Sequence, residues 1–91
     1  MTEKEYIEID RLLAEEKAAE ARTRFEKVNP ENSLEYWMIK GKLDQKFQNW
    51  GDALNAFSNV LKIDGGNEEA TNHISIIRNI LNFWNPEMFN P

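Results

Sequence analysis

The chain has 91 residues, a formal net charge of −5 and no cysteine. This length supports one small domain but not a deep, water-excluding active site. The lack of cysteine excludes disulfides and thiolate metal sites, and an acidic chain without a basic stripe is not suited to binding nucleic acid.

The N-terminal stretch MTEKEYIEID is acidic and contains no apolar run, so it does not resemble a signal peptide. No window approaches the roughly 18 apolar residues that a membrane span requires. We therefore expect a cytoplasmic protein without membrane or nucleic-acid partners, although a chain trimmed of a leader would give the same sequence.

Apolar residues recur at spacings of three and four, which predicts an all-α protein of about five helices. The first helix is expected to begin at Thr2, where Glu5 would complete a capping box, and to fade at the polar segment 14–17. The second is expected over 18–28, because Pro30 forces the residue before it out of helical geometry.

The remaining helices are also marked by caps and breakers. Asn32 or Ser33 caps a third helix that reaches about Phe47. The fourth and fifth helices are expected over 50–63 and 67–84, separated by glycines in the left-handed conformation that closes a helix.

The third helix carries two apolar faces and one polar face at 100° per residue. The faces comprise Leu34, Trp37 and Gly41; Tyr36, Ile39, Leu43 and Phe47; and Glu35, Met38, Lys42, Gln45 and Lys46. A surface helix needs only one apolar stripe. Two such faces predict neighbours on two sides, as in a stacked array of helices.

An internal repeat links the second and fourth helices. At an offset of 32 residues, Ala21, Phe25 and Val28 recur as Ala53, Phe57 and Val60. Together with Trp37 and Gly41 upstream, this order resembles the tetratricopeptide repeat, in which helix pairs of about 34 residues stack side by side. The tail FWNPEMFNP also resembles the end of small bacterial proteins of this family.

The resemblance implies antiparallel helix pairs stacked as a short right-handed superhelix in one domain, 1–91. It divides the chain into a degenerate leading pair (2–32), a full repeat (33–67), a C-terminal capping helix (68–85) and a tail (86–91). The structural repeat positions would be Trp37, Gly41, Trp50, Ala53, Phe57 and Val60. The chain departs from the family at Lys40, Asp44 and Gly65, where leucine, an aromatic residue and proline are usual.

Small residues at the repeat positions have a physical role. Gly41 and Ala53 are expected where two antiparallel helices cross most closely, so that larger side chains would separate the pair. The reversal before the fourth helix is expected at Gln48-Asn49, with Asn49 as the cap. Gly51 is then part of the first helical turn rather than a loop.

In this family the first helix of each pair lines a concave groove. The resemblance therefore implies a peptide groove formed by Glu35, Met38, Lys42, Gln45, Lys46, Glu69, Asn72 and Asn79, with Asp10 and Ile76 beside them. Met38 would be its apolar anchor. Lys42 and Lys46, one turn apart, either meet a carboxylate of an extended peptide or are ordinary solvated lysines.

Nothing in the sequence indicates catalysis, a metal or a cofactor. His73 is the only histidine, so neither a catalytic dyad nor a multi-histidine metal site can form within one chain. Because its neighbours are polar, we expect it to be solvated. An enzyme would require active residues from another chain.

The last helix is apolar around more than half of its circumference. Its two stripes are Ile74, Ile77, Leu81 and Trp84, and Ile76, Ile80 and Phe83. The terminal helix of an array should be polar outside. Either Met88 and Phe89 in the tail fold back over it, which leaves a monomer, or a second subunit covers it and forms a homodimer.

Two functional hypotheses follow. The first is a non-enzymatic adaptor that binds an unidentified peptide or protein in the groove. The alternative is a structural module that associates with itself through its last helix and has no peptide ligand.

Overall fold

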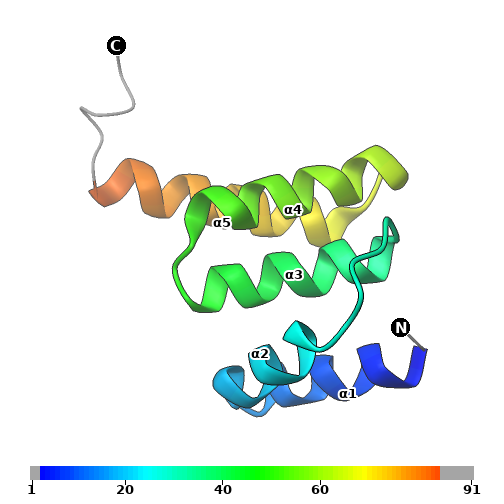
Figure 1. Ribbon diagram of the computed structural model, residues 1–91. Coiled ribbons are helices and arrows are strands. Elements are labelled where there is room, and N and C mark those ends of the chain that lie inside the picture. Colours follow the sequence, from blue (N-terminus) through cyan, green and yellow to red (C-terminus); the bar gives the residue numbers. More distant parts are fainter. Residues whose placement is uncertain (1–2, 85–91) are drawn as a thin grey trace.

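The computed structural model describes residues 3–84, and all regular structure within that range is helical. Figure 1 shows two helix pairs and a final helix packed side by side. The helices are α1 (Glu3–Ala14), α2 (Ala18–Glu26), α3 (Leu34–Lys46), α4 (Trp50–Ile63) and α5 (Glu68–Trp84). The predicted all-α class with five helices is confirmed. Thr2 and the tail, including Met88 and Phe89, lie outside the described residues.

Polar caps set the start of two helices. The Ser33 hydroxyl accepts a hydrogen bond from the Tyr36 amide at 3.2 Å, which places the cap of α3 at the second of its two predicted positions. Asn67 caps α5 by accepting a 2.9 Å bond from the Ala70 amide. Asn49 occupies the N-cap position of α4, but its side chain makes no capping hydrogen bond.

The turns within the two helix pairs repeat each other in detail. Glu16 and Gln48, 32 residues apart, both have a φ of 62°. In the first turn the Lys17 amide donates to the Leu12 carbonyl at 2.8 Å. The Asn49 amide donates to the Asp44 carbonyl at 2.7 Å in the second turn. These six-residue closures are the Schellman form of helix ending, with the left-handed residue just past the helix.

The reversal at Gln48-Asn49 is therefore confirmed, and α4 ends at Ile63 as expected, but the left-handed glycines expected after it are wrong. Neither Gly65 nor Gly66 has a positive φ. The chain leaves α4 instead through Asp64, which is extended and donates its amide to the Val60 carbonyl at 2.8 Å.

The middle helix α3 separates two apolar cores, as its two apolar faces predicted. The first core joins α3 to α1 and α2, and its buried residues are Tyr6, Ile9, Leu12, Leu13, Ala21, Tyr36, Ile39 and Leu43. The second joins α3 to α4 and α5, and its buried residues are Met38, Ala53, Phe57, Val60, Ala70, Ile74 and Ile77. Trp37 packs against both.

The repeat positions lie where α3 and α4 meet. Ala53, Phe57 and Val60 are fully buried, and Gly41 is buried against the Phe57 ring. Trp50 is half-buried and packs against the second core. The small residue at position 41 therefore contacts the aromatic residue of α4, which is a more specific arrangement than a close crossing of two backbones.

The two polar residues that depart from the tetratricopeptide pattern pair with each other. Lys40 Nζ lies 2.7 Å from Asp44 Oδ2, one turn later on α3. An ion pair at this spacing stabilises the helix itself. The opposite charges of Lys40 and Asp44 thus neutralise each other on one side of α3.

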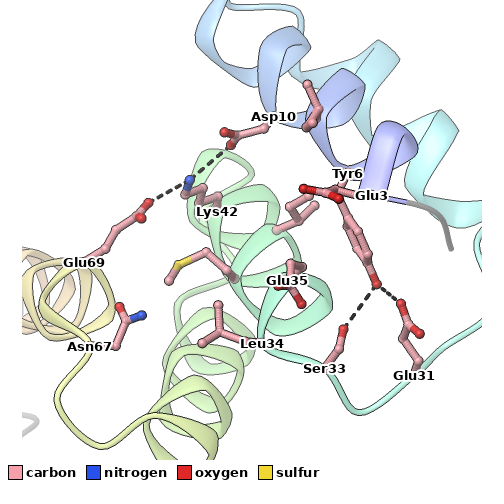
Figure 2. Close-up of a pocket in the computed structure, with 13 residues that line it drawn as sticks. Glu3, Tyr6, Asp10, Glu31, Ser33, Leu34, Glu35, Lys42, Asn67 and Glu69 are labelled. Atoms are coloured by element: carbon pink, nitrogen blue, oxygen red, sulfur yellow. Dashed lines mark hydrogen bonds and ion pairs between the residues drawn. The ribbon is translucent and has the colours of Figure 1, made fainter.

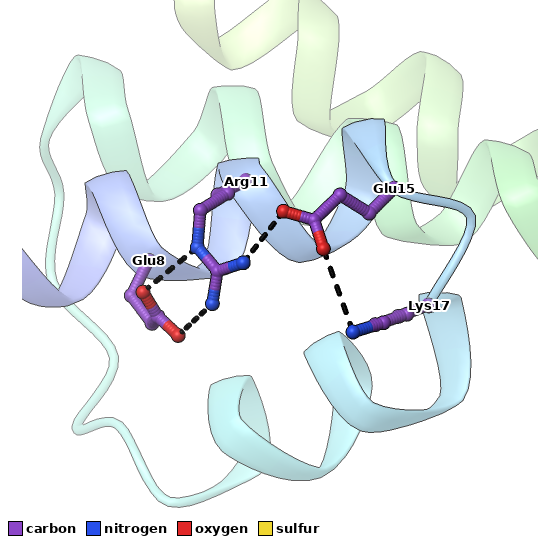
Figure 3. A network of polar contacts seen from close by, with 4 residues as sticks. All are labelled: Glu8, Arg11, Glu15 and Lys17. Carbon is purple, nitrogen blue, oxygen red and sulfur yellow. Dashed lines mark hydrogen bonds and ion pairs between the residues drawn. The ribbon is translucent and has the colours of Figure 1, made fainter.

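The outer surface of the first pair carries a charge network (Figure 3). Arg11 reaches Glu8 on its own helix and Glu15 just past the end of that helix, both at 2.5 Å, and Glu15 also lies 3.4 Å from Lys17. Hydrogen bonds from Arg11 lower the pKa of both carboxyl groups. These exposed pairs stabilise α1 modestly.

Within residues 3–84, no helix combines the length and apolar character needed to cross a membrane.

Candidate peptide-binding groove

A cleft of about 670 Å³ lies between α1, the start of α3 and the start of α5. Figure 2 shows its lining side chains converging from these helices and from the segment before α3. They are Glu3, Tyr6, Ile7, Asp10, Glu31, Ser33, Leu34, Glu35, Met38, Ile39, Lys42, Asn67 and Glu69. We call this the acidic cleft, because five of these described residues are carboxylates and one is a lysine.

Lys42 crosses the open face and connects three helices (Figure 2). Its ammonium lies 3.0 Å from Asp10 of α1 and 2.7 Å from Glu69 of α5, and its side chain is 21% exposed. Burial by itself would lower the pKa of Lys42, but the hydrogen bonds to Glu69 and Asp10 outweigh burial and raise it. Lys42 is therefore neither a solvated lysine nor a cation free to meet a ligand carboxylate.

A second pocket of about 630 Å³ adjoins the acidic cleft. Both pockets are lined by Asp10, Lys42 and Glu69, so the ion-paired bridge separates them. The residues that line only the second pocket are Leu13, Ala14, Gln45, Lys46, Gln48, Trp50 and His73. The two pockets form one groove along α1, α3 and α5, with the bridge across its middle.

His73 is half-buried in the second pocket, so the expectation of a solvated histidine is wrong. Its ring stacks on Phe57, with centroids 4.7 Å apart and planes parallel within 1°, and its Nδ1 lies 2.8 Å from Gln45 Oε1. Burial lowers the pKa of His73, against the opposing effect of Glu69 at 3.9 Å. The neutral imidazole covers the second core.

Met38 belongs to the second core as well as to the floor of the acidic cleft. Only 7% of its surface is exposed, and it packs between α3, α4 and α5. The face of α3 that we expected to be polar is therefore buried at this position. The helical wheel cannot show that α5 crosses this side of α3, because the position of α5 depends on contacts distant in sequence.

The other predicted groove residues divide into three groups. Glu35 is exposed in the acidic cleft, while Gln45 and Lys46 line the second pocket. Lys46 Nζ lies 3.4 Å from Glu16 of the α1–α2 turn, and both side chains are substantially exposed. Asn72 and Asn79 are exposed on α5 but line neither pocket.

The acidic cleft also contains residues that the repeat pattern did not indicate. Tyr6 donates a hydrogen bond to Glu31 and lies 3.3 Å from the Ser33 hydroxyl, so it ties α1 to the segment before α3 (Figure 2). Burial, with the bond to Glu31 as a further cause, raises the pKa of Tyr6 to about 12. The phenol therefore remains a protonated donor at neutral pH.

One sequence signal could have located these residues. Tyr6 is a polar aromatic residue on the apolar stripe of α1, and buried tyrosines usually need a hydrogen-bond partner. No such signal marks Glu31, because the segment 29–33 has no regular periodicity.

No cluster of three or more potential metal ligands occurs among residues 3–84. His73, the one histidine in the chain, stacks on Phe57 and lies 3.9 Å from Glu69. Comparisons with protein-family models, with curated proteins and with solved structures find no match.

Proposed function

We propose that this chain is a non-enzymatic scaffold of the tetratricopeptide type, which binds a peptide or protein segment in the groove along α1, α3 and α5. The observation that carries the proposal is the pair of adjoining pockets on one open face, lined by side chains from all three helices. Apolar floor residues and charged walls are the usual components of a peptide-binding site. The proposal assigns no catalytic residue and no cofactor.

The repeated helix pair supports the choice of scaffold. Glu16 and Gln48, 32 residues apart, share the same left-handed φ, and their turns share the same closing hydrogen bond, which supports a duplicated unit over an irregular bundle. Stacked units of this kind present an extended, rigid face. A rigid face loses little conformational entropy when it binds a flexible segment.

Peptide selection followed by NMR tests this function. A random peptide library displayed on phage is selected against the immobilised chain, and the enriched peptides are titrated into isotope-labelled protein. We expect amide shifts to concentrate on groove residues such as Glu35, Gln45 and Glu69. The variant Ile76→Ser, changed on α5 outside both pockets, should bind equally well. Shifts confined to other surfaces, or a selection that yields no binder, would contradict the proposal.

Self-association through α5 is a second candidate, favoured by a different observation. Ile76 is 48% exposed and Phe83 is 80% exposed on the outer side of this helix. Exposed apolar side chains on a terminal helix are typical of an interface. Sedimentation at increasing concentration should then show a dimer that Ile76→Ser dissociates, whereas Ile63→Ser, changed at an exposed isoleucine of α4, leaves it intact. A concentration-independent monomer would eliminate this candidate.

A further inference from the structure

We infer that the acidic cleft takes a cationic segment of a partner protein, in which lysine or arginine residues flank an apolar residue. This inference rests on the proposed function and names the chemical class of its ligand. It reverses the charge preference expected from the two lysines of α3, because the structure places those lysines in internal ion pairs.

The acidic lining of the cleft favours a cationic ligand. Carboxylates reach it from α1, from the segment before α3, from α3 itself and from α5. Among the described residues that line it, Lys42 is the only lysine or arginine, and Asp10 and Glu69 already neutralise that residue. An incoming carboxylate would have to displace one of these partners and meet the remaining acids. An ammonium or guanidinium group meets complementary charge.

Lys42 itself shows how the groove holds a cation. Its ammonium is held by one carboxylate from each side of the groove, with only 21% of the side chain exposed. Its alkyl stem comes from the helix between them. A partner lysine reaching Glu3 and Glu35 would use the same chemistry, with an alkyl stem along the cleft and an ammonium at the acidic rim.

The apolar part of the ligand follows from the floor and the lip of the cleft. Half-buried Leu34 supplies apolar surface at its base, where Met38 and Ile39 are almost fully buried, and Ile7, which is 62% exposed, lies at the α1 edge. Charged groups alone would leave this surface exposed to water. A segment with an apolar residue between two cations covers it and keeps both charges at the rim.

Other occupants fit this cleft less well. The carboxylates form no metal-ligand cluster among the described residues. Nucleic acid would be repelled by the acidic walls. A second copy of the chain would bring a further net charge of −5 against the same acidic surface.

Two labelled peptides that differ only in charge test the inference by fluorescence anisotropy. Each contains a central leucine, flanked by lysines in one peptide and by glutamates in the other. We expect the lysine peptide to bind about tenfold tighter or more, and its affinity to fall between about 0.05 and about 0.5 M NaCl as screening increases. A lysine peptide with serine in place of leucine should bind about fivefold more weakly.

Matched charge reversals locate the binding. Glu3 and Glu35 lie in the first turns of α1 and α3, whereas Glu20 and Asp52 lie in the first turns of α2 and α4, outside the cleft. All four are exposed. The double variant Glu3→Lys with Glu35→Lys should weaken the lysine peptide about tenfold. Glu20→Lys with Asp52→Lys makes the same change in net charge and should alter affinity by no more than about twofold.

The outcomes separate this inference from the proposed function. Tighter binding of the glutamate peptide, with amide shifts in the groove, would overturn the cationic ligand but leave the binding groove in place. Equal weakening by the two double variants would also overturn it, because net charge rather than the cleft would then set affinity. Failure of both charged peptides overturns the inference, and the proposed function fails as well only if the random library yields no groove binder.

Discussion

Gly41 of α3 lies directly against the aromatic ring of Phe57 of α4. A Cβ built on Gly41 would stand 2.7 Å from two ring carbons, closer than side chains approach one another in folded proteins. Phe57 is fully buried, and His73 of α5 stacks on its ring. The absence of a side chain at position 41 therefore sets how closely α3, α4 and α5 pack.

Replacing Gly41 by leucine should destabilise the fold by about 1–3 kcal/mol, because the buried ring cannot move without disturbing the second core. Urea unfolding followed by tryptophan fluorescence measures the loss. Gly51→Ala is the control, since nothing lies within 4 Å of a Cβ at that position and alanine favours helix. An unchanged urea midpoint for Gly41→Leu would contradict this packing.

The left-handed residues of the two repeated turns should respond alike to glycine. Glu16→Gly and Gln48→Gly each remove the steric cost of a side chain at a φ of 62° and should stabilise the chain by about 0.5–1 kcal/mol. Asn55→Gly, on the exposed side of α4, should instead cost about 1 kcal/mol. Thermal unfolding compares the three, and opposite effects at positions 16 and 48 would show that the turns are not equivalent.

The bridge through Lys42 should couple the three helices of the groove. Lys42→Met keeps the apolar stem but removes both ion pairs, and should cost about 1–2 kcal/mol at low salt. The loss should shrink in about 1 M NaCl, where these half-exposed partners are screened. Lys46→Met removes one longer, more exposed pair and should cost about 0.5 kcal/mol or less.

A double-mutant cycle of Lys42→Met with Glu69→Gln isolates the coupling between α3 and α5. Strict additivity of the two changes in unfolding free energy would show that this pair contributes nothing to the fold.

Stability should fall as the pH drops below about 6.5, the ordinary pKa of a histidine. Because burial lowers the pKa of His73 in the folded chain, the unfolded chain binds more protons in this range. The contribution of His73 is thus present above its unfolded pKa and lost as the pH falls towards its folded pKa. Glu69 and Lys42, the charged groups that face it, act in opposite directions.

Urea unfolding between about pH 5.5 and about pH 7.5 measures this slope, above the range where Glu8 and Glu15 titrate. His73→Gln should flatten the profile, because His73 is the only histidine in the chain. A wild-type profile that is already flat, or a slope that survives the substitution, would contradict the assignment.

Local features of the sequence were sufficient to predict the helices. Proline before α3, the Ser33 cap and the three-four spacing of apolar residues act within a turn or two of the chain, so they can be recognised without any tertiary structure. The two apolar faces of α3 likewise predicted its two cores, since the direction of each side chain follows from its place on the helix. The prediction of left-handed glycines after α4 was wrong, because an extended residue, Asp64, ends this helix equally well.

Amino-acid sequence by itself therefore determined an all-α chain, the helix pairs and the central position of α3, because helix propensity and amphipathic spacing are short-range properties. The tertiary structure alone decided the character of the groove. Lys42 meets Asp10, 32 residues before it, and Glu69 of the final helix α5, while Met38 and His73 are covered by helices that only packing brings together. Charge and burial depend on which surfaces meet. For this reason the two lysines, expected to face a ligand or the solvent, are ion-paired, and the cleft beside them is acidic.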